Sequence, residues 1–169
     1  RALVYRRDHF SEAGLDPDRA PQTWDELLEY CRILTNPDKG RHGLFLYASG
    51  ENLSWGVYSF IVSTDARAVV RDKDGQWRAG FGTRGCAEAI YMIWRLGKEP
   101  FERDGRMITG AAKLATPSEA GENYLARGRA AMAINYLSEE VLSDMNPQLF
   151  GVAPVPESPF GSRGSEVNC

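Results

Sequence analysis

The sequence is poor in the residues that mark disulfide-rich, metal-binding and many catalytic proteins. It has three cysteines and two histidines in 169 residues. The cysteines, Cys31, Cys86 and Cys169, are odd in number and show no CxxC spacing, which argues against a disulfide framework, although their redox state stays undecided. The histidines, His9 and His42, stand far apart and have no partner at ligand spacing, so we expect no metal site.

Long apolar runs and an excess of positive charge are also missing. No apolar stretch reaches the roughly 20 residues that are needed to span a bilayer. The net charge of −3 and the pI near 5.5 give no basic surface for nucleic acid or for an anionic membrane. The sequence has no GxSxG elbow and no cysteine–histidine pair that would mark a nucleophile. We therefore predict no catalytic residue and no cofactor.

The predicted elements alternate between strand and helix, which indicates a layered α/β fold. Compact apolar runs indicate buried strands, and apolar residues at three- and four-residue spacing behind a polar cap indicate helices. The turn Asp-Lys-Asp-Gly between residues 69–70 and 76–77 predicts a hairpin. We expect strands over 2–5, 43–48, 130–135 and 150–155, and helices that start at Thr23, Ser54, Thr83, Ser118 and Ser138.

Three of the expected helices carry further signals. Thr23 and Glu26 have the spacing of a capping box. The helix from Ser54 is apolar nearly all round, which predicts that it is sandwiched between other elements. Residues 101–117, rich in Gly and Thr, are expected to be irregular. The helix from Thr83 carries apolar residues on one face: Ala87, Ile90, Tyr91 and Trp94.

Four stretches of the chain resemble the family of extracellular solute-binding proteins that serve sugar importers. The first combines LVYRRD at 3–8 with EAGLD at 12–16, similar to the family's crossover strand and the helix after it. The second, PQTWDEL at 21–27, resembles the helix start P-x-TW-[DE]-E-L. The third, LARGRAAMAI at 125–134, resembles a helix end, G-x-AAM and a strand. The fourth, GVAPVP at 151–156, resembles G-V-x-P-x-P before a Gly-rich loop.

The resemblance implies a periplasmic-binding-protein-like fold, in which two α/β lobes are joined by crossing strands and hold solute in the cleft between them. Residues 1–169 are then expected to be a single fragment, mostly the second lobe, with a mixed sheet flanked by helices. Residues 1–6 and 151–156 are expected to be crossover strands at the hinge, and 157–169 a loop towards the missing part. Both ends are expected to be cuts through a longer protein.

A sugar site needs aromatic surfaces for the apolar sugar faces and planar polar side chains for the hydroxyl groups. Such side chains work best from loops at the mouth of a rigid sheet, and the resemblance implies that the loop before the helix from Ser54 faces the cleft. The chain departs from the family at Ser63-Thr64, where a Gly-Gly pair is common, and after Asn135, where Gly and Trp are common. The expected ligand-binding residues are Glu51, Asn52, Trp55, Asn135, Tyr136 and Arg163.

Each of these residues also has a plain structural interpretation. Trp55 and Tyr136 are equally well explained as core residues, and Glu51 and Asn52 as part of an ordinary connection. An arginine in a Gly-rich loop, such as Arg163, is more often simply solvated than functional.

The function implied is non-catalytic binding of a sugar or oligosaccharide for uptake by an ABC transporter. The partners are then a carbohydrate-like solute and a membrane permease, with no nucleic acid, and the protein is expected to be a monomer. Its location is expected to be periplasmic or extracellular, and lipid anchoring is left open. One alternative is a ligand-sensing domain for a signalling partner. Another is a nucleotide-dependent α/β enzyme using GFGTRG at 80–85, although residues 74–79 are too polar for the buried strand which that motif requires.

Overall fold

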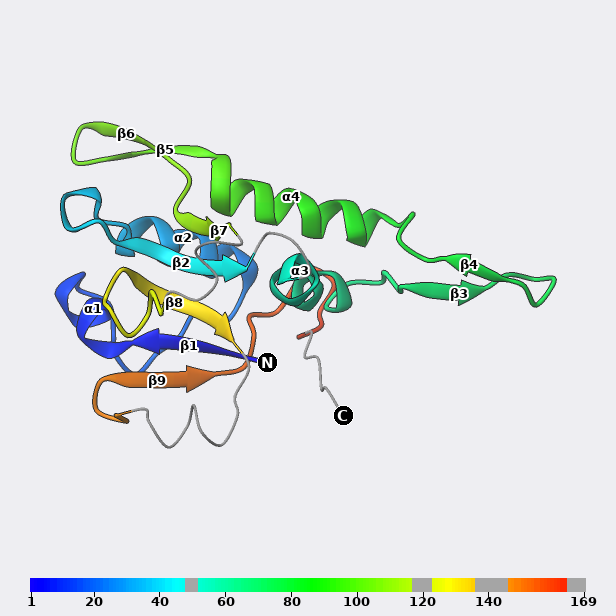
Figure 1. The fold of residues 1–169 in the computed structure, drawn as a ribbon, viewed down its shortest axis with the longest axis horizontal. Coiled ribbons are helices and arrows are strands. Elements are labelled where there is room, and N and C mark those ends of the chain that lie inside the picture. The colour runs from blue at the N-terminus through cyan, green and yellow to red at the C-terminus, as the bar shows by residue number, and fades with distance from the viewer. Residues whose placement is uncertain (48–51, 117–122, 136–145, 164–169) are drawn as a thin grey trace.

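A mixed five-stranded sheet forms the centre of the molecule (Figure 1). The structure is a computed structural model that describes residues 1–47, 52–116, 123–135 and 146–163. The strand order is β7-β2-β8-β1-β9, in which β1 runs antiparallel to both neighbours and the other four strands are parallel to one another. The strands of this sheet are β1 (Ala2–Arg6), β2 (His42–Tyr47), β7 (Ala112–Ala115), β8 (Ala130–Asn135) and β9 (Phe150–Ala153).

Helices flank the sheet, and two small hairpins extend from the body. The predicted α/β fold with a mixed sheet flanked by helices is therefore confirmed. None of the helices in the described part of the chain is long and apolar enough to cross a membrane. The helices are α1 (Arg7–Glu12), α2 (Trp24–Leu34), the 3-10 helix η1 (Pro37–Lys39), α3 (Asn52–Val62) and α4 (Arg84–Lys98). The hairpins are β3 (Val69–Arg71) with β4 (Trp77–Ala79), and β5 (Pro100–Arg103) with β6 (Arg106–Thr109).

The start of α2 is fixed by the cap that the sequence predicts. The Thr23 hydroxyl accepts a hydrogen bond from the Glu26 amide at 3.2 Å. In the usual capping box the Glu side chain accepts from the amide of the cap residue, here Thr23. In this protein Glu26 Oε2 accepts instead from the amide of Gln22, one residue earlier, at 2.7 Å. The predicted apolar stripe faces the core, since these residues are all buried: Trp24, Leu27, Leu28 and Cys31.

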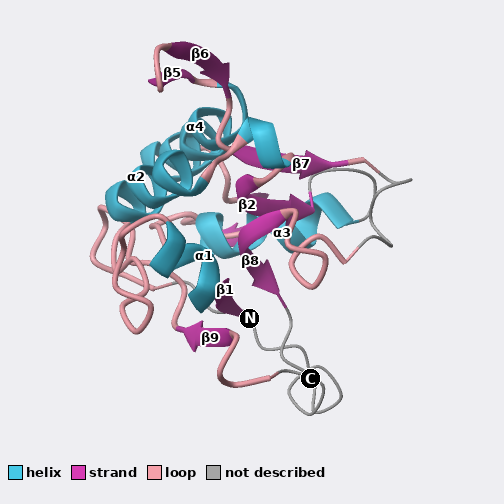
Figure 2. Cartoon of the chain, turned by 90° about the vertical axis from the view of Figure 1, so that its left-hand side faces the viewer, coloured by secondary structure: helices cyan, strands magenta, loops and turns pink. Residues whose placement is uncertain are grey.

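One face of the sheet is covered by α2 and α4 (Figure 2). α2 contacts β2 and β8, whereas α4 contacts β7 and α2. Gly43 permits a close approach of α2 to β2, because a Cβ at this position would lie 2.1 Å from the Cys31 carbonyl oxygen. Leu44, Leu46 and Met132 point from the strands into this larger core.

A smaller apolar cluster lies on the other face of the sheet. Successive strand residues point to opposite faces, so Phe45 points away from the core that its two neighbours in β2 enter. Its ring stacks on Tyr124, with ring centroids 4.7 Å apart. Ala115, Ala130 and Ala133 complete this cluster.

The region between α4 and β8 differs from the prediction. Residues 101–117 were expected to be irregular, but they contain most of β5 and all of β6 and β7. The turn between β5 and β6 is Asp104-Gly105, and both residues have positive φ, which is the backbone that an Asp-Gly hairpin turn requires. This Asp-Gly pair was the signal that the sequence-based interpretation missed.

One predicted helix start is wrong, and two others lie outside the described residues. α3 begins at Asn52, so Ser54 lies inside its first turn and does not cap it. The helix expected from Ser118 is described only from residue 123, and residues 124–128 form turns. The helix expected at Ser138 lies outside the described residues.

Candidate functional site

The parallel strands bring their carboxyl ends to one edge of the sheet. Tyr47, the last residue of β2, is in register with Ala115, the last residue of β7. Phe45 pairs with Ala133 in the parallel β2–β8 ladder, so Tyr47 is also level with Asn135 at the end of β8. Ligands of open α/β sheets bind beyond the carboxyl ends of the strands. We call this edge the carboxyl edge, formed by the ends of β2, β7, β8 and β9: Tyr47, Ala115, Asn135 and Ala153.

The first turn of α3 lies beside the carboxyl edge. Four residues, 48–51, connect Tyr47 to Asn52, where α3 starts. Gly56 packs directly on the end of β2, because a Cβ there would lie 2.0 Å from the Tyr47 carbonyl oxygen. No residue from Gly56 to Thr64 is exposed. α3 is therefore sandwiched, as the sequence predicts, and its start is held against the end of β2.

Of the six predicted ligand-binding residues, three have a described backbone at this edge, and two more are their neighbours in the sequence. Glu51 immediately precedes α3, and Asn52 and Trp55 lie in its first turn. Asn135 ends β8 and Tyr136 follows it. The structure describes the backbone of Asn52, Trp55 and Asn135 but not their side chains, and Glu51 and Tyr136 lie outside the described residues. The fold therefore brings two segments far apart in sequence to one edge.

Arg163 lies away from the first turn of α3. The loop that carries it packs at the other end of this helix, because the Ser158 hydroxyl donates to the carbonyl of Ser63, the residue after α3. Its guanidinium has protein partners: Nη2 donates to Gln22 Oε1 at 3.4 Å, and Nε lies 3.5 Å from Glu157 Oε2. An 11-residue helix is about 16 Å long at 1.5 Å per residue. Within the described residues, Arg163 is therefore not placed beside the first turn of α3.

Tyr47 is a candidate that the sequence-based interpretation missed. It is half-buried at the carboxyl edge, and its ring lies edge-on to Phe45, with centroids 5.1 Å apart and planes at 84°. A fixed and partly exposed ring is the kind of surface on which a sugar face can stack. The available signal was an aromatic residue at the last position of an apolar run, directly before a polar loop.

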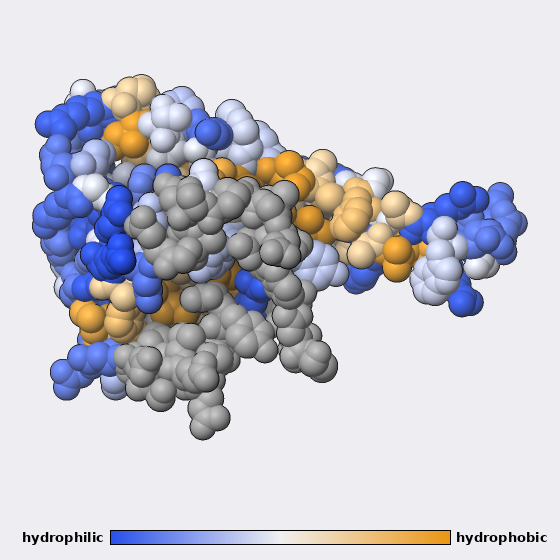
Figure 3. Space-filling view, viewed as in Figure 1, coloured by the Kyte–Doolittle hydropathy of each residue, from blue (hydrophilic) through white to orange (hydrophobic). Residues whose placement is uncertain are grey.

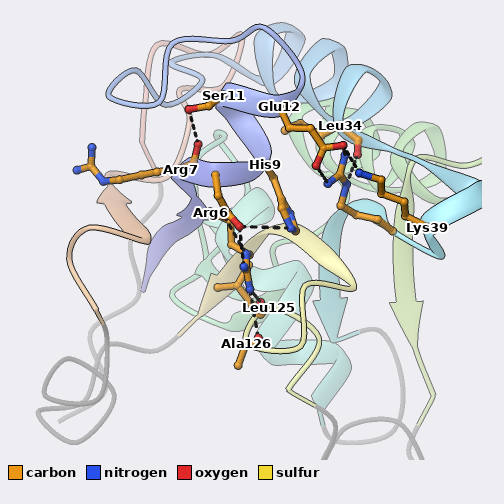
Figure 4. A network of polar contacts seen from close by, with 11 residues as sticks. Arg6, Arg7, His9, Ser11, Glu12, Leu34, Lys39, Leu125 and Ala126 are labelled. Carbon is orange, nitrogen blue, oxygen red and sulfur yellow. Dashed lines mark hydrogen bonds and ion pairs between the residues drawn. The ribbon is translucent and has the colours of Figure 1, made fainter.

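The opposite edge of the sheet carries a dense polar network (Figure 4). Glu12 in α1 accepts from Arg41 Nη1 at 2.9 Å and from Lys39 Nζ at 2.6 Å. The Arg41 side chain is only 4% exposed, and its Nε also donates to the Leu34 carbonyl at 3.1 Å. Hydrogen bonds from Arg41 and then from Lys39 lower the pKa of Glu12 to about 2. The network joins α1, the end of α2 and the start of β2, which is a structural role.

His9 is buried next to this network. Its burial, followed by the positive charge of Arg41, lowers its pKa to about 4, so the ring is neutral at pH 7. Among the described residues its Nδ1 has no hydrogen-bond partner. Arg6, whose charge also lowers the pKa of His9, donates to the carbonyls of Leu125 and Ala126 at 3.0 and 3.2 Å. A shifted pKa often marks a functional site. Here the shift is explained by burial and by Arg41 and Arg6, two arginines that hold backbone carbonyls in place.

Two of the three glycines at the start of α4, Gly80 and Gly85, are explained by packing. A Cβ at Gly80 would lie 2.2 Å from the Arg67 carbonyl oxygen. The Gly85 amide donates to Asp65 Oδ1 at 3.1 Å, and the Thr83 hydroxyl caps the helix. The Asp65 carboxylate thus occupies the place at the helix start where a nucleotide phosphate would bind. Within the described residues, no group of three or more His, Cys, Asp or Glu side chains is placed to hold a metal ion.

Comparison with known proteins identifies the family. The sequence model of the bacterial extracellular solute-binding proteins matches residues 1–167, and the chain belongs to this family. A Brucella abortus protein named only as a binding protein is 28% identical over 167 residues, which are 98% of this chain and 38% of that protein. The mannitol-binding protein of Pseudomonas aeruginosa is 35% identical over 78 residues, 46% of this chain and 17% of its own length.

Solved structures support the same fold. A solute-binding protein of an ABC transporter from Thermotoga lettingae, bound with α-D-tagatose, has a TM-score of 0.72 and 25% identity, covering 92% of this chain and 38% of its own. The cyclic α-maltosyl-1,6-maltose binding protein of Arthrobacter globiformis has a TM-score of 0.69 and 26% identity, covering 96% and 38%. The chain therefore spans about 38% of the length of these relatives, and its fold is that of the periplasmic-binding-protein-like sugar-binding proteins.

Proposed function

We propose that the full-length protein binds a sugar, oligosaccharide or polyol without changing it chemically and delivers it to the membrane permease of an ABC importer. The observation that carries this proposal is family membership over residues 1–167. Relatives named for mannitol binding and for binding of a maltose-derived saccharide support the class of solute. The protein acts outside the cytoplasmic membrane, in the periplasm or at the cell surface, as a monomer.

The solute is held at the carboxyl edge. A sugar requires a ring to stack on and amide or carboxylate groups for its hydroxyls. Glu51, Asn52 and Trp55 at the start of α3 and Asn135 and Tyr136 at the end of β8 supply both kinds of group. Arg163 has an indirect role in this proposal: it holds its loop to the segment before α2 through Gln22, and its own partners are protein groups.

The 169 residues are mostly the second lobe of a two-lobed receptor. In this proposal residues 1–6 and 151–156 are the strands that cross between the lobes, and 157–169 lead towards the other lobe. Leu3 and Ala153 are paired in neighbouring antiparallel strands, so the start of β1 and the end of β9 lie side by side at the same edge of the sheet. Solute binds the closed form more tightly than the open form, and so it shifts the two lobes towards closure about these strands.

The direct test is isothermal titration calorimetry of the full-length protein against a panel of monosaccharides, disaccharides and polyols. We expect saturable binding of at least one of them, with no covalent change in the recovered solute. No heat with any member of the panel, together with binding of a peptide or a metal ion, would contradict the class of solute.

A pair of tryptophan variants locates the site. Trp55→Ala at the start of α3 is expected to weaken binding at least about tenfold, which corresponds to about 1.4 kcal/mol. Trp77→Ala removes an exposed tryptophan from the β3–β4 hairpin and should leave the affinity unchanged. Equal affinities of the two variants, with both proteins folded, would place the site away from α3.

A further inference from the structure

Three aromatic rings form a series on the face of the sheet that carries the smaller apolar cluster. Phe45 lies in the middle: its ring stacks on Tyr124, with planes at 24°, and lies edge-on to Tyr47, with planes at 84°. Phe45 and Tyr124 are 5% and 4% exposed, whereas Tyr47 is half-buried. Tyr47 is therefore the ring of the three that a ligand can reach.

The inner end of this ring series is anchored by the protein. The guanidinium of Arg129 lies over the Tyr124 ring, 4.8 Å from its centroid. The Tyr124 carbonyl accepts from the amides of Arg129 and Ala130 at 2.8 and 3.1 Å, which fixes Tyr124 at the start of β8. Figure 3 shows mostly hydrophilic surface at that end of the sheet, opposite the carboxyl edge. The ring series thus runs from an anchored, polar end to the carboxyl edge, where Tyr47 ends β2.

The contacts of Tyr47 within the sheet leave ring surface for a partner. In an edge-on pair the edge of one ring points at the face of the other, so Phe45 covers at most one face of the Tyr47 ring. On β7 the residue in register with Tyr47 is Ala115, whose methyl group is small beside an aromatic ring. Of these two neighbours, neither therefore covers both faces of the ring.

A fixed, flat surface favours a solute that is itself flat on one side. A cyclic sugar keeps several C–H groups on one side of its ring, and these groups can pack together on an aromatic face. An open-chain polyol rotates about each of its C–C bonds and keeps no such surface. Because the packing on Phe45 already holds the Tyr47 ring in place, little side-chain entropy is lost there on binding.

We propose that Tyr47 stacks on the solute and that Phe45 positions its ring, so that the site selects cyclic sugars over open-chain polyols. Phe45 is a positioning residue, because it is buried and acts on the solute only through Tyr47. This inference rests on the proposed function and narrows the class of solute within it.

The stacking role is tested on the full-length protein by isothermal titration calorimetry. The panel contains cyclic sugars (glucose, galactose, xylose, maltose and trehalose) and open-chain polyols (mannitol, sorbitol and ribitol), and we expect the tightest binding from a cyclic sugar. Tyr47→Leu keeps apolar bulk without a flat ring and should weaken binding of that sugar about fivefold or more. Tyr47→Phe keeps the ring and should weaken it by no more than about twofold.

A double-mutant cycle tests the positioning role. Phe45→Leu should weaken sugar binding about threefold or more, because a loosened Tyr47 ring loses freedom on binding. The same change should have no further effect in the Tyr47→Leu protein, whereas a merely structural role would weaken binding equally in both backgrounds. Urea midpoints show whether each variant is folded. Tyr124→Leu removes the stacking partner of Phe45 and takes its place in the cycle if Phe45→Leu does not fold.

The outcomes separate this inference from the proposed function. If the native protein binds no member of the panel, the proposed class of solute and this inference are overturned together. Tightest binding of a polyol, or sugar binding that Tyr47→Leu leaves unchanged, would overturn this inference alone. Equal effects of Phe45→Leu in the two backgrounds would overturn the positioning role of Phe45.

Discussion

Replacing Gly56 by alanine should disturb the junction on which the proposed site depends. A Cβ at residue 56 would lie 2.0 Å from the Tyr47 carbonyl oxygen, and real Cβ contacts shorter than 3.0 Å essentially do not occur. α3 and β2 must therefore separate by about 1 Å at this point. Overpacking of this kind costs about 1–3 kcal/mol, and the better helix propensity of alanine returns about 1 kcal/mol. These two terms leave a net loss of about 0–2 kcal/mol, and we expect a value in the upper half of that range, because the contact is with backbone that cannot rotate away.

The assay is urea unfolding of the full-length protein, followed by titration with its solute. Gly56→Ala should lower the urea midpoint, and it should also weaken solute binding, because Asn52 and Trp55 belong to the displaced turn. Gly82→Ala is the matched control, since nothing lies within 4 Å of its added Cβ. If Gly56→Ala and Gly82→Ala unfold at the same urea concentration and bind solute equally well, α3 does not rest on the end of β2.

Three further predictions concern acid stability, thiol reactivity and nucleotides. His9 has a pKa of about 4 in the folded protein, lowered by burial and by Arg41. In the unfolded chain a histidine takes up a proton near pH 6.5. The free energy of unfolding should therefore fall as the pH drops from about 6.5 to about 4. His9→Gln should flatten this part of the curve of unfolding free energy against pH, and an unchanged slope would exclude His9 as its source. Burial raises the pKa of the fully buried Cys31 thiol. Iodoacetamide at pH 7.5 should therefore modify Cys86 in the native protein, and Cys31 only in denaturant. Labelling of Cys31 in the native protein would show that the core under α2 opens. Because Asp65 already occupies the start of α4, ATP and NAD should leave the melting temperature unchanged, and a rise of several degrees would revive a nucleotide site.

The fold was largely predictable because its main signals are local and strong. The Thr23 cap and the buried stripe of α2 follow from spacing alone, and the apolar runs at β1, β2, β8 and β9 follow from composition. The residues after α4 were not predicted, because β7 has only four residues and owes its place to pairing with β2, which is a contact distant in sequence. Periodicity also could not tell which face of α4 is buried. Both faces are apolar, and the small residues Gly85 and Ala89 on the buried side gave a weaker signal than Tyr91 and Trp94 on the exposed side.

The candidate site was predictable only in part. Asn135 and the segment before the third helix were proposed mainly from the resemblance to the family, and only their positions next to strand ends can be read from the order of elements. The convergence of these two segments depends on the parallel pairing of β2 with β8, which composition does not reveal. Arg163 was proposed because a guanidinium can donate several hydrogen bonds to a ligand, but the pairing of its loop with the start of α2 is a tertiary contact that the sequence does not reveal. Tyr47 was overlooked because the sequence does not show whether an aromatic residue at a strand end is buried in the core or exposed at the surface.

Hydrogen exchange of the full-length protein with and without its solute tests the central claim most directly. The account predicts that solute slows exchange of backbone amides around residues 48–56 and 135–137, at the carboxyl edge, and of the crossing segments that move on closure. Amides of the polar network around Arg41 at the opposite edge should exchange at unchanged rates. Protection confined to the opposite edge or to the β3–β4 hairpin, with none at the carboxyl edge, would contradict the account.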